Sequence, residues 1–257
     1  MITNDSIAAE TINYGIGKSD SIRNDNRTAN QLRSIECTSH VLSRSSGSVQ
    51  YSQGTTSLYC SIHTPVQCTY RDELNDRCII QCNIYQPAQS NTTTTDVMYN
   101  TIIESIFTHI IDIFTYPRMK LIISVQVIHN DGSLLSCIIN GIMLALLDSG
   151  IQLNSLCSSS TLLLQHEYNF NNNTTQSFNI TLDPILSEQN AANNTMVAVY
   201  STTQDTNKLI QLYCNVYGDS ITPDQYFDTC NVAQLTCKHM IEYIKSVHEK
   251  RLQALNS

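Results

Sequence analysis

Hydrophobic and polar residues alternate over much of the first third of the chain, which is the pattern of half-buried β-strands. Two of these runs flank Gln53-Gly54-Thr55, and Gly54 supplies the positive φ that a tight hairpin turn requires. The alternation predicts strands at residues 35–43, 48–52, 57–63 and 77–85.

Helical periodicity replaces the alternation in three segments. After a polar loop at residues 86–95, Asp96 begins a helix with hydrophobic residues at i, i+3, i+4 and i+7, and Pro117 is predicted to stop it. Residues 134–149 are almost entirely apolar, which predicts a deeply buried helix with Gly150 as its C′ residue. A last helix, at about residues 222–252, begins with Thr222 as N-cap and Pro223 in its first turn.

The order of the remaining segments defines the fold class. Further strands are predicted at residues 121–128, 159–164, 177–182, 196–200 and 208–216. Strands, helix, strand, helix, strands and helix in this order indicate an α+β domain with helices packed on sheets. Residues 1–30 are rich in Ser, Asn and Asp and have little periodicity, so we expect a disordered or loosely attached extension before a domain at residues 31–257.

The charge of the chain limits its possible partners. Only 14% of the residues are charged, the net charge is −8, and hydrophobic residues make up 41%. Phosphate contacts dominate nucleic-acid affinity, and residues 78–117 contain no Lys or Arg. This composition describes a globular protein and argues against strong RNA binding by the isolated chain.

Ten cysteines raise the question of zinc sites or disulfides. No pair has the C-x2-C spacing, and most cysteines lie in apolar, periodic surroundings, so we interpret them as buried thiols. Several Asn-x-Ser/Thr motifs leave a secreted, disulfide-bonded binding protein as an alternative. Residues 1–31 lack the apolar core of a signal peptide, which disfavours it, and no apolar run is long enough to predict a membrane span.

Several motifs, in order, resemble the RNase PH family. Tyr116-Pro117-Arg118 followed by an alternating strand, and Leu182-Asp183-Pro184, match family segments. The most specific match is Asn130-Asp131-Gly132-Ser133-Leu134-Leu135-Ser136-Cys137 with the Ala145–Ile151 segment after it. The opening of the domain carries the rest of the resemblance at Leu32-Arg33, Leu42–Ser48, Gln53–Ser57 and Thr64-Pro65.

The resemblance implies a fold, an assembly and a place in the cell. The expected fold is the RNase PH fold, a type of the ribosomal protein S5 domain 2-like group with mixed sheets and packed helices. The chain would be one subunit of the six-membered ring of the RNA exosome, with ribosomal RNA-processing protein 43 as a neighbour and cap proteins above it. RNA would meet it only in the assembled channel, in the nucleus, nucleolus and cytoplasm, and no membrane or cofactor is expected.

The positions that carry catalysis in active family members are altered here. The resemblance implies that such members are phosphorolytic 3′ exonucleases, which bind the phosphate nucleophile with a Thr-Arg step. In this chain the corresponding residues are Leu134-Leu135. Their paired aspartates correspond to the region of Gln189 and Thr195. Leucine cannot bind an anion, so we expect a non-catalytic subunit whose degenerate positions are Leu135, Gln189 and Thr195.

The remaining charged residues have simple structural interpretations. Glu188 is expected to be a solvated surface group, and Asp183 to belong to a turn with Pro184. Asp131 and Asp148 are interpreted as turn and helix-end residues rather than metal ligands. 

Arg44 and Arg118 stand at family positions and are the weak candidates for RNA contact, although pairing with a carbonyl or an acid explains each equally well. The alternative to a non-catalytic subunit is a homo-oligomeric nuclease with residual phosphorolytic or metal-dependent activity.

Overall fold

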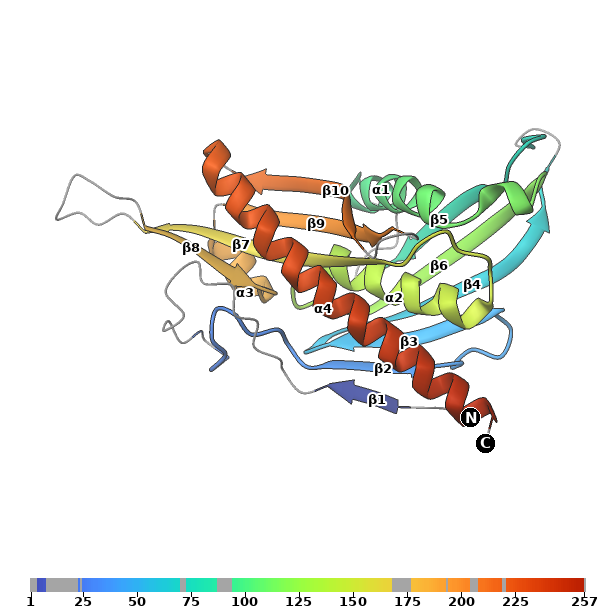
Figure 1. Cartoon of the computed structure of the whole chain (residues 1–257), viewed down its shortest axis with the longest axis horizontal. Helices are drawn as coiled ribbons and strands as arrows, with labels where there is room; N and C mark the ends of the chain where they lie inside the picture. The colour runs from blue at the N-terminus through green and yellow to red at the C-terminus, as the bar shows by residue number, and fades with distance from the viewer. Residues whose placement is uncertain are drawn as a thin grey trace.

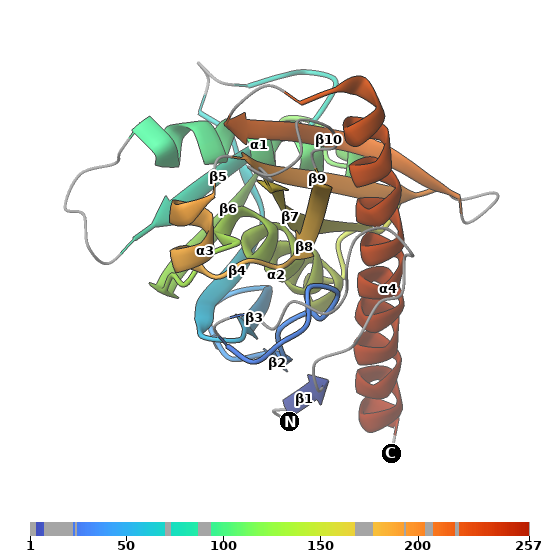
Figure 2. The ribbon, with the colours of Figure 1, turned by 90° about the vertical axis from the view of Figure 1, so that its left-hand side faces the viewer.

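The computed structural model describes residues 4–7, 23, 25–69, 73–86, 94–167, 177–192, 194–203, 208–218 and 221–256. In this part of the chain, two β-sheets lie on either side of the helix α2 (Leu134–Ser149), and a long helix, α4 (Pro223–Asn256), runs along one side of the molecule (Figures 1 and 2). The architecture is α+β, as the order of the predicted elements indicates.

The first sheet has six strands in the order β1-β2-β3-β4-β6-β5. Neighbouring strands are antiparallel except for β5, which runs parallel to β6. The predicted hairpin is confirmed: Gln53 pairs with Thr56, and Gly54 has a φ of +60°. The strands are β1 (Asn4–Ile7), β2 (Ile35–Ser39), β3 (Gly47–Gln53), β4 (Thr56–Gln67), β5 (Ile79–Tyr85) and β6 (Met119–His129).

The second sheet is entirely antiparallel and has the order β10-β9-β7-β8. Its central strand β9 is buried almost throughout, whereas the edge strand β10 has no fully buried residue. The strands are β7 (Cys157–Glu167), β8 (Ser177–Leu182), β9 (Asn194–Thr202) and β10 (Leu209–Gly218). The predicted loop at residues 169–175 lies outside the described residues.

Helix α2 is the centre of the core. It packs against β3 and β4 of the first sheet and against β7 of the second, so both of its faces are buried. Residues 134–146 are all buried, which confirms the prediction from their apolar sequence. Gly150 ends the helix with a φ of +72°, the left-handed conformation that favours glycine at this position.

The helix predicted to end at Pro117 is shorter than expected. Helix α1 (Thr94–Ile110) packs on β5 and stops before Ile111, which forms a β-bridge with Leu153. The Asp112 N–H then donates to the carbonyl of Gln152, so tertiary pairing draws the chain out of the helix. A short 3-10 helix, η1 (Ile113–Thr115), fills the interval before Pro117.

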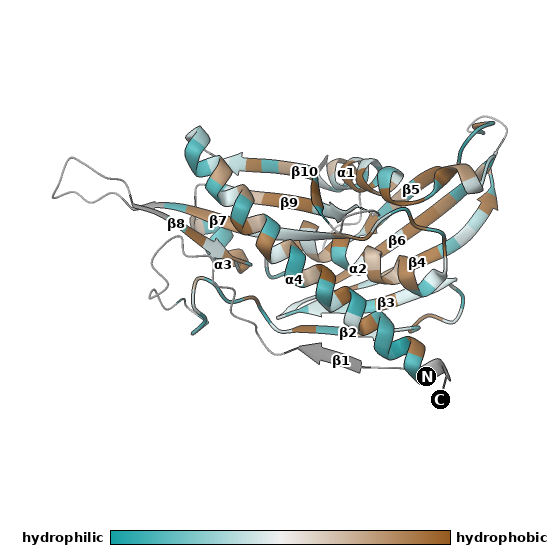
Figure 3. Cartoon of the chain, viewed as in Figure 1, coloured by the Kyte–Doolittle hydropathy of each residue, from teal (hydrophilic) through white to brown (hydrophobic). Residues whose placement is uncertain are grey.

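Helix α4 begins where the sequence predicts. The Gln225 N–H donates to Thr222 Oγ1 at 3.4 Å, and the Thr222 N–H donates to Gln225 Oε1 at 3.2 Å, which together form a capping box. The helix packs on β7 and β9, and hydrophilic and hydrophobic residues alternate along it (Figure 3). This amphipathic pattern is typical of a helix with one face on a sheet and one in water.

The extension before residue 31 is attached more firmly than the sequence predicts. Strand β1 pairs antiparallel with β2, so the expectation of a loose extension is wrong for residues 4–7. Arg23 and Arg27 also hold the chain, because their guanidinium groups donate to the carbonyl oxygens of Leu182 and Asp183. Charged contacts to a distant segment leave no periodic signal in a sequence, which is why composition alone suggested disorder.

The cysteines follow the apolar pattern around them. All ten are free thiols, of which seven are buried and Cys68, Cys214 and Cys230 are half-buried. Within the described residues, no helix combines the length and the apolar character needed to span a bilayer.

Candidate functional site

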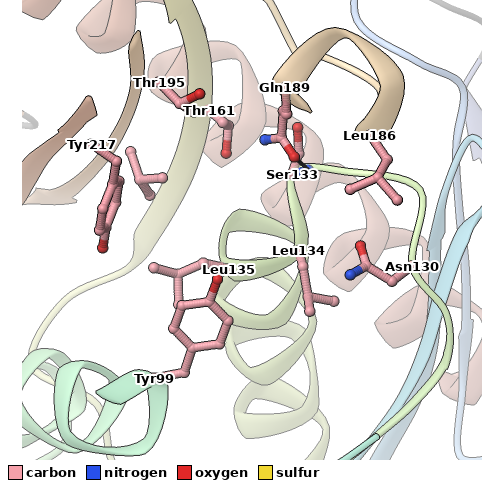
Figure 4. Close-up of a pocket in the computed structure, with 11 residues that line it drawn as sticks. Tyr99, Asn130, Ser133, Leu134, Leu135, Thr161, Leu186, Gln189, Thr195 and Tyr217 are labelled. Carbon is pink, nitrogen blue, oxygen red and sulfur yellow. Dashed lines mark hydrogen bonds between the residues drawn. The ribbon is translucent and has the colours of Figure 1, made fainter. Parts of the chain in front are cut away.

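A cavity of about 270 Å³ opens at the N-terminal end of α2, between the two sheets. Side chains from the second sheet, from the turn after β6 and from three helices meet there, including α3 (Leu186–Ala191), a short helix that the sequence did not predict (Figure 4). The cavity is lined by Tyr99, Asn130, Ser133, Leu134, Leu135, Thr161, Leu186, Gln189, Thr195, Val197 and Tyr217.

The three positions predicted to be degenerate lie together in this cavity. Leu135 comes from the first turn of α2, Gln189 from α3 and Thr195 from β9, and all three side chains line the cavity. The structure therefore joins residues that are up to 60 positions apart in the sequence. Whatever chemistry the cavity supports depends on these side chains.

The amide of Gln189 occupies the N-terminal end of α2. The Ser133 N–H donates to Gln189 Oε1 at 3.3 Å, so a neutral side chain accepts a backbone donor that would otherwise be open to an anion. The Ser133 hydroxyl is also engaged, because it donates to the carbonyl of Pro184 at 3.0 Å. The left-handed backbone of Ser133, with a φ of +52°, is held by these contacts.

All side chains that line the cavity are uncharged at neutral pH. Two amides, two tyrosines, three hydroxyl-bearing residues and four aliphatic residues make up its wall. Burial raises the pKa of the Tyr99 hydroxyl, which keeps it neutral as well. The wall offers hydrogen bonds, but neither a carboxylate to act as an acid or hold a metal nor a cation to bind phosphate.

Charged residues gather beside the cavity rather than in it. Arg33 donates from Nη2 to Asp183 Oδ1 at 2.6 Å and from Nε to Asp183 Oδ2 at 2.9 Å, which forms a bidentate ion pair. Its guanidinium also donates to the carbonyl oxygens of Asp131 and Gly132 at 2.9 and 3.3 Å. Arg33 thus fixes the backbone that leads into the first turn of α2.

The Arg33–Asp183 pair is almost fully buried, with side-chain exposures of 5% and 3%. Burial by itself raises the pKa of a carboxyl group, but the adjacent Arg33 charge and hydrogen bonds lower the pKa of Asp183 below its usual value. Asp183 does lie in a turn before Pro184, with a φ of +47°, yet its carboxylate serves as the buried partner of Arg33. The turn interpretation alone was incomplete.

Glu188 is not the solvated surface group that the sequence predicts. Arg23 Nε donates to Glu188 Oε1 at 2.8 Å and Nη2 contacts Oε2, and the two side chains are only 5% and 13% exposed. Glu188 also accepts the N–H of Ile185 at 3.0 Å at the start of α3. The correction arises because Arg23 and Glu188 are 165 residues apart, a distance over which the sequence shows no pairing.

The two other aspartates have structural positions. Asp131 follows β6 in the turn before α2, where its carboxylate accepts a hydrogen bond from Thr55. Asp148 lies near the end of α2, accepts the Ser48 N–H at 2.7 Å and forms an ion pair with Arg251 of α4. Neither side chain lines the cavity.

Arg44 and Arg118 lie away from the cavity. Arg118 precedes β6, whereas the cavity residue Asn130 follows it, so the full strand separates them. Arg118 is 64% exposed and its Nε lies 3.5 Å from Glu73 Oε1. Arg44 is exposed in the loop between β2 and β3. The structure does not bring these two arginines to the other predicted site residues.

Sequence reasoning missed several cavity residues. Tyr99 and Tyr217 lie on α1 and β10, within patterns that predict only a helix and a strand. Asn130 belongs to a motif that was singled out, but as a turn residue. The sequence contains no signal for the tyrosines, because their convergence depends on how the two sheets pack around α2.

Comparisons with known proteins identify the first half of the domain. Residues 31–152 match the profile of the 3′ exoribonuclease family, domain 1, which is the RNase PH family. This segment contains Arg33, the hairpin, α1, β6 and α2, including the Asn130–Cys137 motif on which the resemblance mainly rested.

The RNase PH fold extends over nearly the whole chain. The crystal structure of Rrp46 from rice superposes with a TM-score of 0.74 at 21% identity, over 88% of this chain and all of the rice chain. At this identity the likeness establishes the fold, and its coverage of this chain extends beyond the residues of the profile match.

Several curated relatives are named as exosome proteins. The chain is 32% identical over 134 residues to the Exosome complex exonuclease RRP46 homolog of Arabidopsis thaliana, covering 52% of this chain and 56% of the relative. It is 36% identical over 114 residues to the Exosome complex component rrp46 of Schizosaccharomyces pombe, covering 44% and 50%. The chain spans about half the length of the curated relatives it matches.

The names of two relatives agree with a resemblance that two segments of the sequence carry. The Gly132–Cys137 segment and the Ala145–Ile151 segment after it resemble exosome component 5, also called ribosomal RNA-processing protein 46. The Arabidopsis and Schizosaccharomyces relatives carry that name, whereas a matched relative from Caenorhabditis briggsae is named as a putative RRP41.

Proposed function

We propose that this chain is a non-catalytic structural subunit of the RNA exosome ring, where it supports 3′-to-5′ RNA processing by the complex. The observation that carries the proposal is the neutral cavity at the N-terminal end of α2, in which Leu135, Gln189 and Thr195 take the positions expected for a phosphate-binding and metal-binding centre. The similarity to proteins named as exosome components supports the assembly.

The loss of chemistry follows from the side chains themselves. Phosphorolysis requires a bound phosphate nucleophile and a group that stabilises the leaving oxygen. Leu135 contributes an apolar surface that raises the cost of desolvating an anion, and the Gln189 amide already accepts the Ser133 N–H at 3.3 Å. The described residues that line the cavity therefore supply neither the cation nor the carboxylates that this reaction needs.

The proposed partners are other RNase PH-type ring subunits, with ribosomal RNA-processing protein 43 as the neighbour, and the cap proteins of the exosome. Half-exposed edge strands such as β10 suit a protein that is completed by neighbours. RNA is the substrate of the whole assembly and meets this subunit in the channel. We place the assembly in the nucleus, nucleolus and cytoplasm.

A phosphorolysis assay tests the catalytic part of the proposal. Purified full-length chain, single-stranded RNA, inorganic phosphate and Mg²⁺ should release no nucleoside diphosphates. The Arabidopsis relative carries the word exonuclease in its name, so the assay tests whether this chain has exonuclease activity. Activity that survives repurification and is lost in Gln189→Ala would overturn the proposal, because the activity would then arise in this cavity.

Affinity purification from cells tests the structural part separately. The tagged chain should recover the other ring subunits in equal amounts, and a chain that is recovered alone or only with copies of itself contradicts the assembly. RNA binding by the isolated chain should be weak, with a Kd in the range of about 10⁻⁴ to 10⁻⁶ M at physiological salt. The net charge of −8 is the reason for this expectation.

A further inference from the structure

The wall of the cavity at the N-terminal end of α2 suits an uncharged ligand. Among the described residues that line it, none is a cation or a carboxylate, so an anion and a metal ion both lack a counter-charge there. Leu134, Leu135 and Leu186 supply apolar surface, and amide and hydroxyl groups supply hydrogen bonds. An apolar wall with a few placed polar groups is the usual composition of a site for a small neutral molecule.

Two amides in this wall keep their nitrogen atoms available as donors. Asn130 Oδ1 accepts the Gly132 N–H at 3.2 Å, and Gln189 Oε1 accepts the Ser133 N–H at 3.3 Å. Both backbone donors lie in the turn before α2, so the fold fixes the carbonyl end of each amide. The two amide nitrogens have no hydrogen-bond partner among the described residues, and each carries two hydrogen atoms to donate.

Two hydroxyl groups add to these donors. Figure 4 shows the Tyr99 side chain entering from α1 with its hydroxyl pointing into the cavity, and the Thr195 side chain entering from β9. Neither hydroxyl has a hydrogen-bond partner within the part of the chain that the structure describes. Burial raises the pKa of Tyr99, so its hydroxyl stays protonated at neutral pH. The Tyr217 hydroxyl is already engaged, because it lies 3.1 Å from the Tyr213 hydroxyl.

The available groups determine which atoms a ligand must offer. Amide nitrogens only donate, whereas hydroxyls donate or accept, so the ligand needs acceptors arranged around a small apolar body. The cavity volume of about 270 Å³ is slightly below the range of about 300–1,000 Å³ for drug-sized ligands, which limits the ligand to a single small ring system. Uracil is a flat, uncharged ring with two carbonyl oxygens, and it has this chemistry.

We propose that the cavity binds an uncharged nucleobase of the uracil type, either in a free nucleoside or as an unpaired base of RNA. The RNA source rests on the proposed function, which brings RNA to this subunit in the channel, whereas binding of a free nucleoside requires only the cavity. The amides of Asn130 and Gln189 donate to the carbonyl oxygens of the base, and aliphatic side chains cover the ring. The ligand therefore differs from the phosphate that the Thr-Arg step of active RNase PH members binds.

Calorimetric titration of the full-length chain with uridine tests the site. The Kd should be about 0.1–1 mM, because a ligand of this size makes few contacts. Cytidine should bind about tenfold more weakly, because its amino group presents a donor where uridine has an acceptor. Inorganic phosphate should not compete with uridine. Undetectable uridine binding, equal affinity for the two nucleosides, or displacement of uridine by phosphate would each overturn the proposal.

Two variants locate the site, and a third is the matched control. Tyr99→Phe removes one hydroxyl and should weaken uridine binding about 3–10-fold. Gln189→Glu keeps an acceptor for the Ser133 N–H but removes the amide donors, so it should weaken binding more than tenfold, on the order of a lost donor to a ligand carbonyl. Tyr85→Phe, on an exposed tyrosine of β5, should bind like the wild type. Wild-type affinity in both cavity variants contradicts the proposal. Circular dichroism verifies that each variant is folded.

A short single-stranded oligouridine distinguishes the two sources of the base. Displacement of uridine by the oligonucleotide assigns the cavity to an unpaired base of RNA, and uridine binding that the oligonucleotide leaves unchanged assigns it to free nucleosides. The outcome is separable from the proposed function. Release of nucleoside diphosphates in the phosphorolysis assay would refute the non-catalytic assignment alone, whereas a chain that assembles normally and does not bind uridine would refute only the nucleobase site.

Discussion

The cavity and the ion pairs beside it differ sharply in charge although they share the same backbone. The residues that line the cavity are all neutral, whereas Arg33, Asp183, Arg23 and Glu188 form buried or nearly buried pairs a few residues away. Asp183 and Glu188 flank Pro184 and Leu186, and Arg33 binds the carbonyl of Gly132 directly before the cavity residue Ser133. Among the described residues, charged pairs hold the walls in place, and the side chains that line the walls are neutral.

A sequence motif can match a family for two reasons: its residues hold the fold, or they take part in the chemistry. Leu182-Asp183-Pro184 and Asn130–Ser133 match the RNase PH pattern, and in this chain Arg33 links the two segments. Removing one partner of a buried ion pair strongly destabilises a protein, so the fold requires these residues whatever the cavity does. The side chains that line the cavity form no buried ion pair, and Leu135, Gln189 and Thr195 among them are the positions that depart from the expected catalytic pattern.

The largest expected effect on stability comes from removing Arg33. In Arg33→Met, Asp183 remains buried without its bidentate partner, so the free energy of unfolding should fall by about 3–5 kcal/mol. Urea unfolding followed by circular dichroism measures the change. Gln189→Ala, in the cavity wall, is the matched control and should cost about 1 kcal/mol or less, as is usual for one neutral hydrogen bond. Equal losses for the two variants would show that the cavity is as structural as the ion pair.

The Asp183 carboxylate should give the fold a specific acid dependence. Its pKa in the folded state lies below the unfolded value near 4, so its stabilising contribution is present above that pH and is lost as the pH falls toward the folded pKa. Asp183→Asn should therefore cost about 2–3 kcal/mol at pH 7, and its deficit relative to the wild type should shrink below about pH 4. Asp76→Asn, on a carboxylate that is 70% exposed, is the control. A deficit that stays constant down to pH 3 contradicts the pairing.

The Arg23–Glu188 pair should contribute less, because Glu188 retains some contact with water at 13% exposure. Glu188→Gln and Arg23→Gln should each lower the free energy of unfolding by about 1 kcal/mol, with a favourable coupling between them in a double-mutant cycle. Thermal unfolding of the four proteins measures this coupling. Strictly additive losses would mean that the extension before residue 31 is not held through this pair.

The elements of the fold were largely predictable, because each has a local cause. Gly54 marks the hairpin, the apolar run before Gly150 marks α2, and Thr222-Pro223 marks the start of α4. The contacts that the sequence did not reveal are long-range. Helix α3 is six residues long and polar, so it has no periodicity to detect, and its role as the partner of Arg23 depends on tertiary packing.

The candidate site was predictable at the positions that a family motif marks, and nowhere else. Leu135, Gln189 and Thr195 were identified by comparison with an expected pattern, and the structure places them in one cavity. Tyr99 and Tyr217 complete that cavity from α1 and β10, and no motif marks them. A side chain that enters a site only because two sheets pack around α2 cannot be inferred from its neighbours in the sequence.

The smallest expected effect comes from returning an arginine to the cavity. Leu135 lies in the first turn of α2 and lines the cavity, so the guanidinium of Leu135→Arg can extend into this space while its methylene groups replace the leucine side chain. The variant should fold with a free energy of unfolding within about 1.5 kcal/mol of the wild type, like the neutral control Leu135→Met. Phosphate affinity should rise, because a cation now faces a helix N-terminus.

Phosphorolysis by Leu135→Arg should nevertheless remain undetectable. A bound phosphate needs a carboxylate that places a metal ion or donates a proton to the leaving oxygen, and the residues at those positions are Gln189 and Thr195. Calorimetric titration with phosphate and an assay of nucleoside diphosphate release separate binding from chemistry in the same preparation. If Leu135→Arg alone releases nucleoside diphosphates from RNA, the remaining cavity is catalytically competent. The contrast between the charged pairs and the neutral cavity would then depend on a single side chain.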